Sequence, residues 1–223
     1  MRVFLASLSF TLLCCAPAQA VLTFTRNWTV NSVIPDNDPL GFQDSHVLSN
    51  GSLPFTTIGS VSVSLVISKI SSTATEGWNG DLYAYLVHRD GFSVLLNRVG
   101  STTSNPAGFS DAGMNVTLSD TASQDIHTAG IFSGTFLPDA READPLAVTD
   151  LSPRTADLSS MRGLAADGTW TLFVADLASG DQLKLVSWGI TVSDIPEPSS
   201  ILAIGTPLLL AGGLVGRRRH SPV

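Results

Sequence analysis

Three histidines lie in the central part of the chain, and histidine is the side chain most often used as a general base. Serine catalysis needs such a base beside a nucleophile and an orienting carboxylate. His46, His88 and His127 are isolated from one another, and no Gly-x-Ser-x-Gly sequence occurs; the stretch from Gly108 to Gly113 misses it by one residue. The sequence therefore predicts a protein without a serine-hydrolase site.

Aspartates stand in the predicted turns and at the predicted strand ends, where calcium sites made of several oxygen ligands are commonly built. Asp81, Asp120 and Asp176 are the strongest candidate calcium ligands. The segment Asp36-Asn37-Asp38 resembles the start of an EF-hand loop, but no glutamate follows at the required position. The alternative for each single aspartate is a turn residue that caps backbone amides. Calcium is the only cofactor that we expect.

Other ligand chemistry is restricted by the remaining residue types. Zinc and iron are not expected, because the histidines are isolated and the only cysteines, Cys14 and Cys15, lie near the N-terminus. Trp78 is the one tryptophan in a predicted turn and is a candidate for a ligand-binding surface. Trp170 and Trp188 stand on predicted strands and are expected in the core.

The N-terminal segment 1–20 has the composition of a secretory signal peptide. Arg2 precedes a short apolar stretch, and small residues, Ala18 and Ala20, occupy the positions that signal peptidase reads before its cut. The alternative is a buried N-terminal helix. Cleavage after Ala20 would leave an exported domain with no cysteine, which must be held together by its core or by a metal ion.

The C-terminal segment 195–223 combines Pro196, Glu197 and Pro198 with an apolar stretch, 199–216, and the basic cluster Arg217, Arg218 and Arg219. The stretch is close to the length of a membrane-spanning helix, and the arginines would stay in the cytoplasm. The alternative is a buried hairpin or core helix, but three consecutive arginines are an implausible end for a buried element. This tail closely resembles the PEP-CTERM sorting signal. The resemblance implies recognition by an exosortase, transient membrane anchoring, and processing near Pro-Glu-Pro in a Gram-negative host.

The region between these ends, 21–194, reads as a series of β-strands. Alternation of apolar and polar residues is clearest in 61–68, and 82–87, 169–175 and 186–192 are further strong strand predictions. Turn residues separate them, and only 157–164 is a candidate short helix or turn. The fold class is therefore all-β, a two-sheet sandwich of about eight strands between the signal helix and the membrane helix.

This region also resembles the P domain (P/Homo B) of subtilisin-like proprotein convertases. The resemblance rests on Gly80-Asp81-Leu82, on 132–138, and above all on the ending from Leu158 to Trp188, with its Gly-x-Trp-x-Leu, Asp, Gly-Asp and Leu-x-x-Trp spacing. It implies a jelly-roll β-sandwich that stabilises a protease in convertases and has no catalysis of its own. No histidine here is followed by Gly-Thr, as in subtilases, and the chain has no room for a subtilase domain.

The charge of the domain restricts its partners. Without Arg2, the three terminal arginines and Glu197, the chain has eight basic and eighteen acidic residues, a formal charge of −10. An acidic surface argues against nucleic acid as a partner. We expect a non-catalytic protein of the cell envelope, the outer surface or the medium that binds or stabilises an extracellular polysaccharide or surface protein. The alternative is an accessory P domain for a separately encoded subtilisin-like protease.

Overall fold

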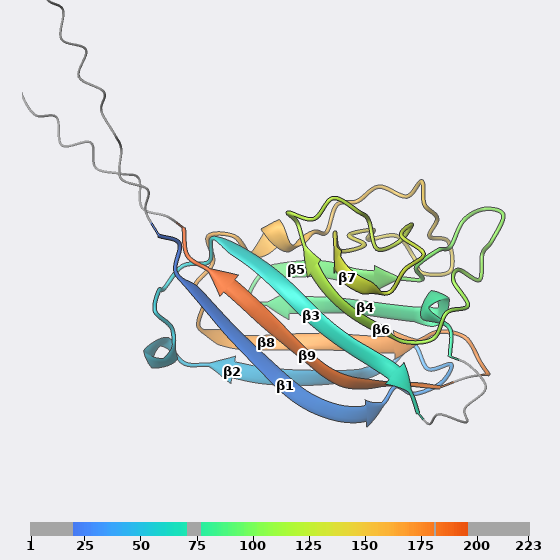
Figure 1. The fold of residues 1–223 in the computed structure, drawn as a ribbon, viewed down its shortest axis with the longest axis horizontal. Coiled ribbons are helices and arrows are strands. Elements are labelled where there is room, and N and C mark those ends of the chain that lie inside the picture. Colours follow the sequence, from blue (N-terminus) through green and yellow to red (C-terminus); the bar gives the residue numbers. More distant parts are fainter. Residues whose placement is uncertain (1–19, 71–76, 181, 196–223) are drawn as a thin grey trace, which may run out of the picture. The chain divides into compact units, whose positions relative to one another are not determined.

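Two antiparallel-rich β-sheets pack face to face in the computed structural model, which describes residues 20–70, 77–180 and 182–195 (Figure 1). One sheet has the strand order β1-β9-β3-β6-β7 and the other β2-β8-β4-β5, and only the β6–β7 pair is parallel. The strands are β1 (Thr23–Val33), β2 (Phe42–Leu48), β3 (Ser60–Lys69), β4 (Leu82–His88), β5 (Gly91–Asn97), β6 (Met114–Ser119), β7 (Ser133–Phe136), β8 (Gly168–Asp176) and β9 (Leu183–Ser193), with the 3-10 turns η1 (Asn50–Ser52), η2 (Asn79–Asp81) and η3 (Leu158–Met161).

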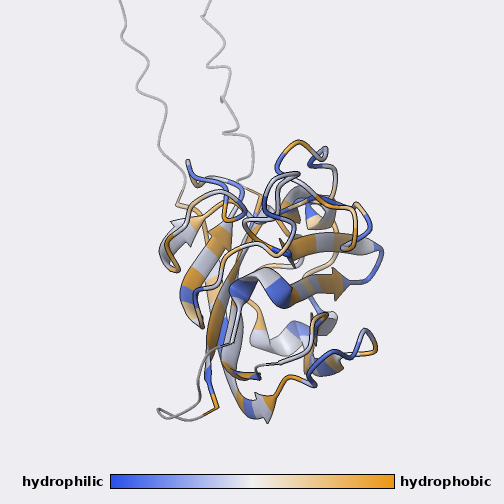
Figure 2. Cartoon of the chain, turned by 90° about the vertical axis from the view of Figure 1, so that its right-hand side faces the viewer, coloured by the Kyte–Doolittle hydropathy of each residue, from blue (hydrophilic) through white to orange (hydrophobic). Residues whose placement is uncertain are grey.

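Period-two alternation is the local reason why these segments are strands. In β3 the apolar residues at every second position are buried and the intervening serines are only half-buried or exposed. Figure 2 shows the same banding of hydrophobic and hydrophilic residues along the strands. The four strong strand predictions coincide with β3, β4, β8 and β9, and 157–164 contains η3. The predicted all-β two-sheet sandwich is confirmed, with nine strands in the described segments.

The core lies between the sheets and contains two tryptophans on opposing layers. Trp170 on β8 is fully buried and Trp188 on β9 is 1% exposed, as expected for indoles on alternating strands. Each indole N–H has an acceptor: Trp170 donates to the carbonyl of Ala166 at 3.2 Å, and Trp188 donates to Asp44 at 2.6 Å. Both rings therefore enter the core without leaving a donor unsatisfied.

Two of the outer strands, β1 and β5, have features that disfavour further pairing. Arg26 is exposed on the edge strand β1 between Phe24 and Trp28, and a charged side chain on an edge strand disfavours the addition of another strand. At the other sheet, residues 138–156 follow the edge of β5: the amide of Ala140 donates to Val94 O, and the amide of Val94 donates to Ala156 O. That covering segment is where a buried polar network is found.

The expected helices at the two ends, 1–20 and 199–216, lie outside the described residues apart from Ala20. Across 20–70, 77–180 and 182–195, no helix has the length and apolar character needed to cross a membrane.

Candidate binding site

A pocket of about 300 Å³ lies where η2, the end of β5 and the turn after β8 meet. The residues that line it are Trp78, Asp81, Arg98, Ala107, Ala178 and Ser179. Trp78 is half-buried in the turn before η2, and its role at a ligand-binding surface stays a prediction. The pocket combines one apolar face with fixed charges, which is the usual make-up of a small ligand site.

Arg98 is held in the wall by an uncommon backbone conformation. Its φ is 49°, in the left-handed region that residues other than glycine rarely occupy. The guanidinium donates to the carbonyl of Gly80 at 2.9 Å and pairs with Asp81 at 3.4 Å, and both side chains are less than a fifth exposed. Such backbone strain concentrates at binding and catalytic sites. Sequence reasoning did not single out Arg98, because only the folded backbone shows its φ.

Gly80 allows the pocket to form, because η2 passes very close to the neighbouring loop. A Cβ atom at Gly80 would lie 2.2 Å from the carbonyl oxygen of Ala107, which lines the pocket. The approach is fixed by the amide of Gly80, which donates to Phe109 O at 2.9 Å, and by Asn79, whose side chain donates to Gly113 O at 3.0 Å. The wall around Asp81 is therefore a rigid part of the sandwich.

Asp176 lies at the end of β8 beside this pocket and is fully buried. Its Oδ1 accepts a hydrogen bond from the amide of Ala178, while its Oδ2 has no hydrogen-bond partner. Burial raises the pKa of Asp176 to about 7; the carboxylates of Asp81 and Asp36 add to the rise, and Arg98 opposes it. Three carboxylates and one guanidinium thus meet at this end of the sandwich, and one carboxyl changes its charge near neutral pH.

The structure brings two of the three predicted calcium ligands together and leaves the third apart. Asp81 and Asp176 are neighbours. The amide of Leu177, the residue after Asp176, donates to the carbonyl oxygen of Asp81, and the charge of Asp81 contributes to the raised pKa of Asp176. Asp120 instead accepts a hydrogen bond from the amide of Leu158. Burial, and to a smaller extent the charge of Asp157, raise the pKa of the Asp120 carboxyl, while this hydrogen bond lowers it. Asp120 thus caps a backbone amide, as the alternative interpretation predicted.

A metal site needs several ligand side chains around one point. Within the described segments, no group of three or more histidine, cysteine, aspartate or glutamate side chains converges as a metal site. Calcium at Asp81 and Asp176 stays a prediction.

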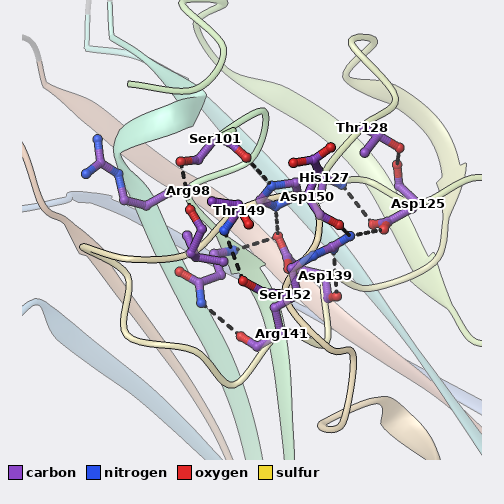
Figure 3. Close-up of polar contacts among 12 residues, drawn as sticks. Arg98, Ser101, Asp125, His127, Thr128, Asp139, Arg141, Thr149, Asp150 and Ser152 are labelled. Carbon is purple, nitrogen blue, oxygen red and sulfur yellow. Dashed lines mark hydrogen bonds and ion pairs between the residues drawn. The ribbon is translucent and has the colours of Figure 1, made fainter. Parts of the chain in front are cut away.

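His127 and Asp139 form a buried ion pair in a polar network that sequence reasoning missed (Figure 3). His127 Nδ1 lies 2.7 Å from Asp139 Oδ2, and Nε2 lies 2.9 Å from the carbonyl of Ser101. Both neighbours are acceptors, so only the doubly protonated ring donates to both. Burial alone would lower the pKa of His127, but the hydrogen bond and charge of Asp139 outweigh it and raise the pKa. The pair is closed to solvent, and both ring nitrogens are engaged.

Arg141, which lies in the segment 138–156 that covers β5, extends this network to further residues. It pairs with Asp139 at 3.2 Å and with Asp125 at 2.8 Å, and it donates to the carbonyl of Asp150. Figure 3 shows His127, Asp139, Arg141 and Asp125 in one cluster, linked by these contacts. The network therefore holds 138–156 against the sandwich, and its residues are too far apart in the sequence for spacing to predict it.

The other two histidines also have packing partners. His88 is fully buried, stacks on Trp170 with ring centroids 3.9 Å apart, and faces two backbone carbonyls. His46 stacks on Trp28 at 4.4 Å and lies 2.8 Å from Asp44, linking an edge strand of each sheet. In the described segments the partners of all three histidines are carboxylates, carbonyls and rings, and none is a hydroxyl.

The predicted processing residues lie outside the described part of the chain, except Ala20, which is exposed. These residues are Ala18, Pro196, Glu197, Pro198, Arg217, Arg218 and Arg219.

Comparison with known proteins gives no family assignment. No family model matches the chain, and no curated protein matches it. Among solved structures it is similar to the serine protease of Aeromonas sobria, with 15% identity over 80% of this chain and 28% of that chain, at a TM-score of 0.43. A chain from the complex of that protease with the chaperone ORF2 matches with 15% identity over 79% and 27%, at a TM-score of 0.42. This chain spans little more than a quarter of either match, and a likeness at this level carries no conclusion about activity.

Proposed function

We propose that this chain is an exported, non-catalytic binding protein of the cell envelope, whose β-sandwich holds a partner outside the membrane. The proposal joins three features of the chain: the leader 1–20, the tail 195–223 and the rigid acidic sandwich between them. In this proposal signal peptidase removes the leader, an exosortase processes the tail, and the membrane holds the protein only transiently, with its C-terminus in the cytoplasm.

The pocket at Trp78, Asp81 and Arg98 is the observation that carries the binding role. It presents an aromatic ring and fixed charges on a rigid wall. By contrast, the histidine–aspartate pair that could resemble catalytic machinery is fully buried, and its ring nitrogens already face Asp139 and a carbonyl. A general base must reach the proton that it abstracts, so His127 is unsuited to that task.

Two measurements test this function. Intact mass of the protein recovered from its host should show loss of the leader and of the tail. Extracts of the cell surface, separated into polysaccharide and protein fractions, should raise the melting temperature of the purified domain, because a ligand that binds only the folded state stabilises it. Recovery of the full-length chain from the cytosol would refute export. An unchanged melting temperature with both fractions would refute the binding role.

The resemblance to P/Homo B domains favours a second candidate function, an accessory domain for a separately encoded subtilisin-like protease. The residues that carry it include Gly80-Asp81-Leu82, of which Asp81 lines the pocket, and the ending from Leu158 to Trp188. Mixing the purified domain with secreted proteases of the host and measuring the proteases' melting temperatures tests this role. A shift supports the accessory function, and no shift leaves the surface-binding function as the better account.

A further inference from the structure

The tripeptide Asp-Pro-Leu occurs twice in the chain, at 38–40 and at 144–146, and both copies form the same turn. Each aspartate accepts the amide of its leucine through Oδ1 at 2.9 Å. Its carbonyl accepts the amide of the residue after the leucine, at 3.0 Å in the first turn and 2.8 Å in the second. Aspartate followed by proline favours such a turn, because the carboxylate caps the backbone and proline presets φ. The sequence thus builds two similar turns far apart in the chain.

The fold brings these two turns to one pocket of about 390 Å³. The first turn contributes its proline and the second contributes all three of its residues. The lining residues are Asn37, Pro39, Asp144, Pro145, Leu146 and Leu177. Two rigid turns from separate segments therefore form the walls of one site.

Both walls are anchored to the sandwich. The amide of Asp38 in the first turn donates to the carbonyl of Asp176 at 2.9 Å. The side chain of Asn97 donates to the carbonyl of Ala143, directly before the second turn, also at 2.9 Å. A ligand that meets such a preformed pocket loses little free energy to ordering the protein.

The leucines of the two turns stay in solvent. Leu40 is 82% exposed and Leu146 is 81% exposed. One exposed leucine needs no explanation, but two that the same turn holds out of the core beside one pocket form an apolar surface. Among the lining residues that the structure describes, none is aromatic, so a sugar ring would have nothing to stack on. Leucine and proline instead suit an aliphatic or aromatic side chain of a partner.

The charges around the pocket are negative. Asp144 lines it, and Asp36 and Asp38 stand on either side of the lining residue Asn37. Within the described residues none of these three carboxylates forms an ion pair, and none of the lining residues is basic. The domain has eight basic and eighteen acidic residues, so a second copy would be repelled. Complementarity favours a partner with positive charge.

We propose that the pocket between the turns 38–40 and 144–146 binds an extended partner polypeptide through an aliphatic or aromatic side chain with lysine or arginine neighbours. This inference goes beyond the proposed function, because it assigns a second binding surface that shares no lining residue with the pocket at Trp78.

Leucine methyl NMR of the full chain in phosphatidylcholine nanodiscs tests the proposal, because Leu146 and Leu177 report on the pocket directly. The probes are acetyl-Ser-Lys-Leu-Lys-Ser-amide and the same peptide with phenylalanine in place of leucine. One control peptide has serine in that place, and another keeps leucine and has glutamate in place of both lysines. We expect one or both probes to shift the two methyl signals. The serine peptide should bind at least about tenfold more weakly, and the glutamate peptide about threefold or more, with the second difference shrinking at high salt.

Two variants with matched controls locate the binding. Leu146→Ser should weaken probe binding about tenfold. Leu151→Ser is its control, because Leu151 is 84% exposed on the same covering segment and does not line the pocket. Asp144→Asn can still accept the amide of Leu146 but removes the charge, so it should narrow the difference between the lysine and glutamate peptides. Asp90→Asn, beyond the far end of β4, should leave that difference unchanged.

Four results would overturn the inference. They are no methyl shift with either probe, equal binding of the serine or glutamate peptide, equal losses in Leu146→Ser and Leu151→Ser, and methyl shifts that follow protein concentration without peptide, which would assign the surface to a second copy. Circular dichroism of each variant shows whether it is folded. The melting-temperature test with surface extracts does not use these peptides, so failure here would leave export and surface binding standing.

Discussion

The Asp176→Asn substitution should stabilise the domain at high pH and have little effect at low pH. The wild-type carboxyl is fully buried, and burial raises its pKa to about 7 from the ordinary aspartate value of 3.8. The folded state therefore holds this proton more tightly than the unfolded state does. The stability that comes from the protonated group is fully present below about pH 4 and is lost as the pH rises through about 7. Asparagine has nearly the same shape and never ionises, so the variant avoids this loss.

The size of the effect follows from the two pKa values. A tenfold change in proton affinity corresponds to about 1.4 kcal/mol, so a change from 3.8 to about 7 corresponds to about 4 kcal/mol at most. The asparagine side chain can still accept the amide of Ala178 through its Oδ1 atom. Its Nδ2 would replace the oxygen that has no partner, so a cost of about 1 kcal/mol offsets part of the gain. We expect Asp176→Asn to raise the free energy of unfolding by about 2–4 kcal/mol at pH 8.

Urea denaturation followed by tryptophan fluorescence, in buffers from about pH 4.5 to about pH 8.5 with EDTA, measures this difference. The free energies of unfolding of the two proteins should agree near the acidic end, diverge as the pH rises from about 4 to about 7, and keep a constant difference at higher pH. A variant that is less stable than wild type at pH 8, or a difference that does not change with pH, would refute the reasoning. Calcium added in place of EDTA gives a second result: if it stabilises wild type at pH 8 but not the variant, the ion binds at Asp176, and if it has no effect there, the calcium prediction is wrong.

Three further predictions concern the network, the pocket wall and processing. His127→Gln should lower the free energy of unfolding by about 2 kcal/mol near pH 6, because it removes one of the two cations that pair with the buried Asp139 carboxylate and leaves Arg141 as the other. In wild type this stability is present below the unfolded pKa of 6.5 and is lost as the pH rises through the raised pKa of the folded state, so a variant with wild-type stability at pH 6 would contradict it. Gly80→Ala should destabilise the domain by about 2 kcal/mol or more in urea denaturation, whereas Gly51→Ala, whose Cβ would meet no atom within 4 Å, should be close to neutral; equal effects would be inconsistent with the close approach. Intact mass should place the new N-terminus after Ala20 and the C-terminus near 196–198, and an uncut chain would show that the sorting assignment is wrong.

Much of the secondary structure could be predicted from this sequence, because a half-buried strand has a local signal. The alternating serines and aliphatic residues of β3 predict one buried face, and the indoles of Trp170 and Trp188 were expected in the core that they occupy. The turn chemistry around Trp78 likewise indicated an accessible aromatic ring. In each case the relevant information lies within a few neighbouring residues.

The candidate site could be predicted only in part, because its members come from separate strands. Turn chemistry placed Asp81 and Asp120 ahead of Asp176 as calcium ligands. In the structure Asp81 and Asp176 are neighbours and Asp120 lies apart from them, and one oxygen of the buried Asp176 has no hydrogen-bond partner. The strained backbone of Arg98 and the pairing of His127 with Asp139 leave no mark in sequence spacing.

By itself, therefore, the sequence determined the strands, the all-β class, the acidic charge of the domain and the predicted signals at its two ends. Only the tertiary structure decided which charges are neighbours and which are removed from water. The physical reason is that a pKa or a pocket depends on burial and on distances between segments that the chain brings together only when it folds, as it does for Asp81 and Asp176.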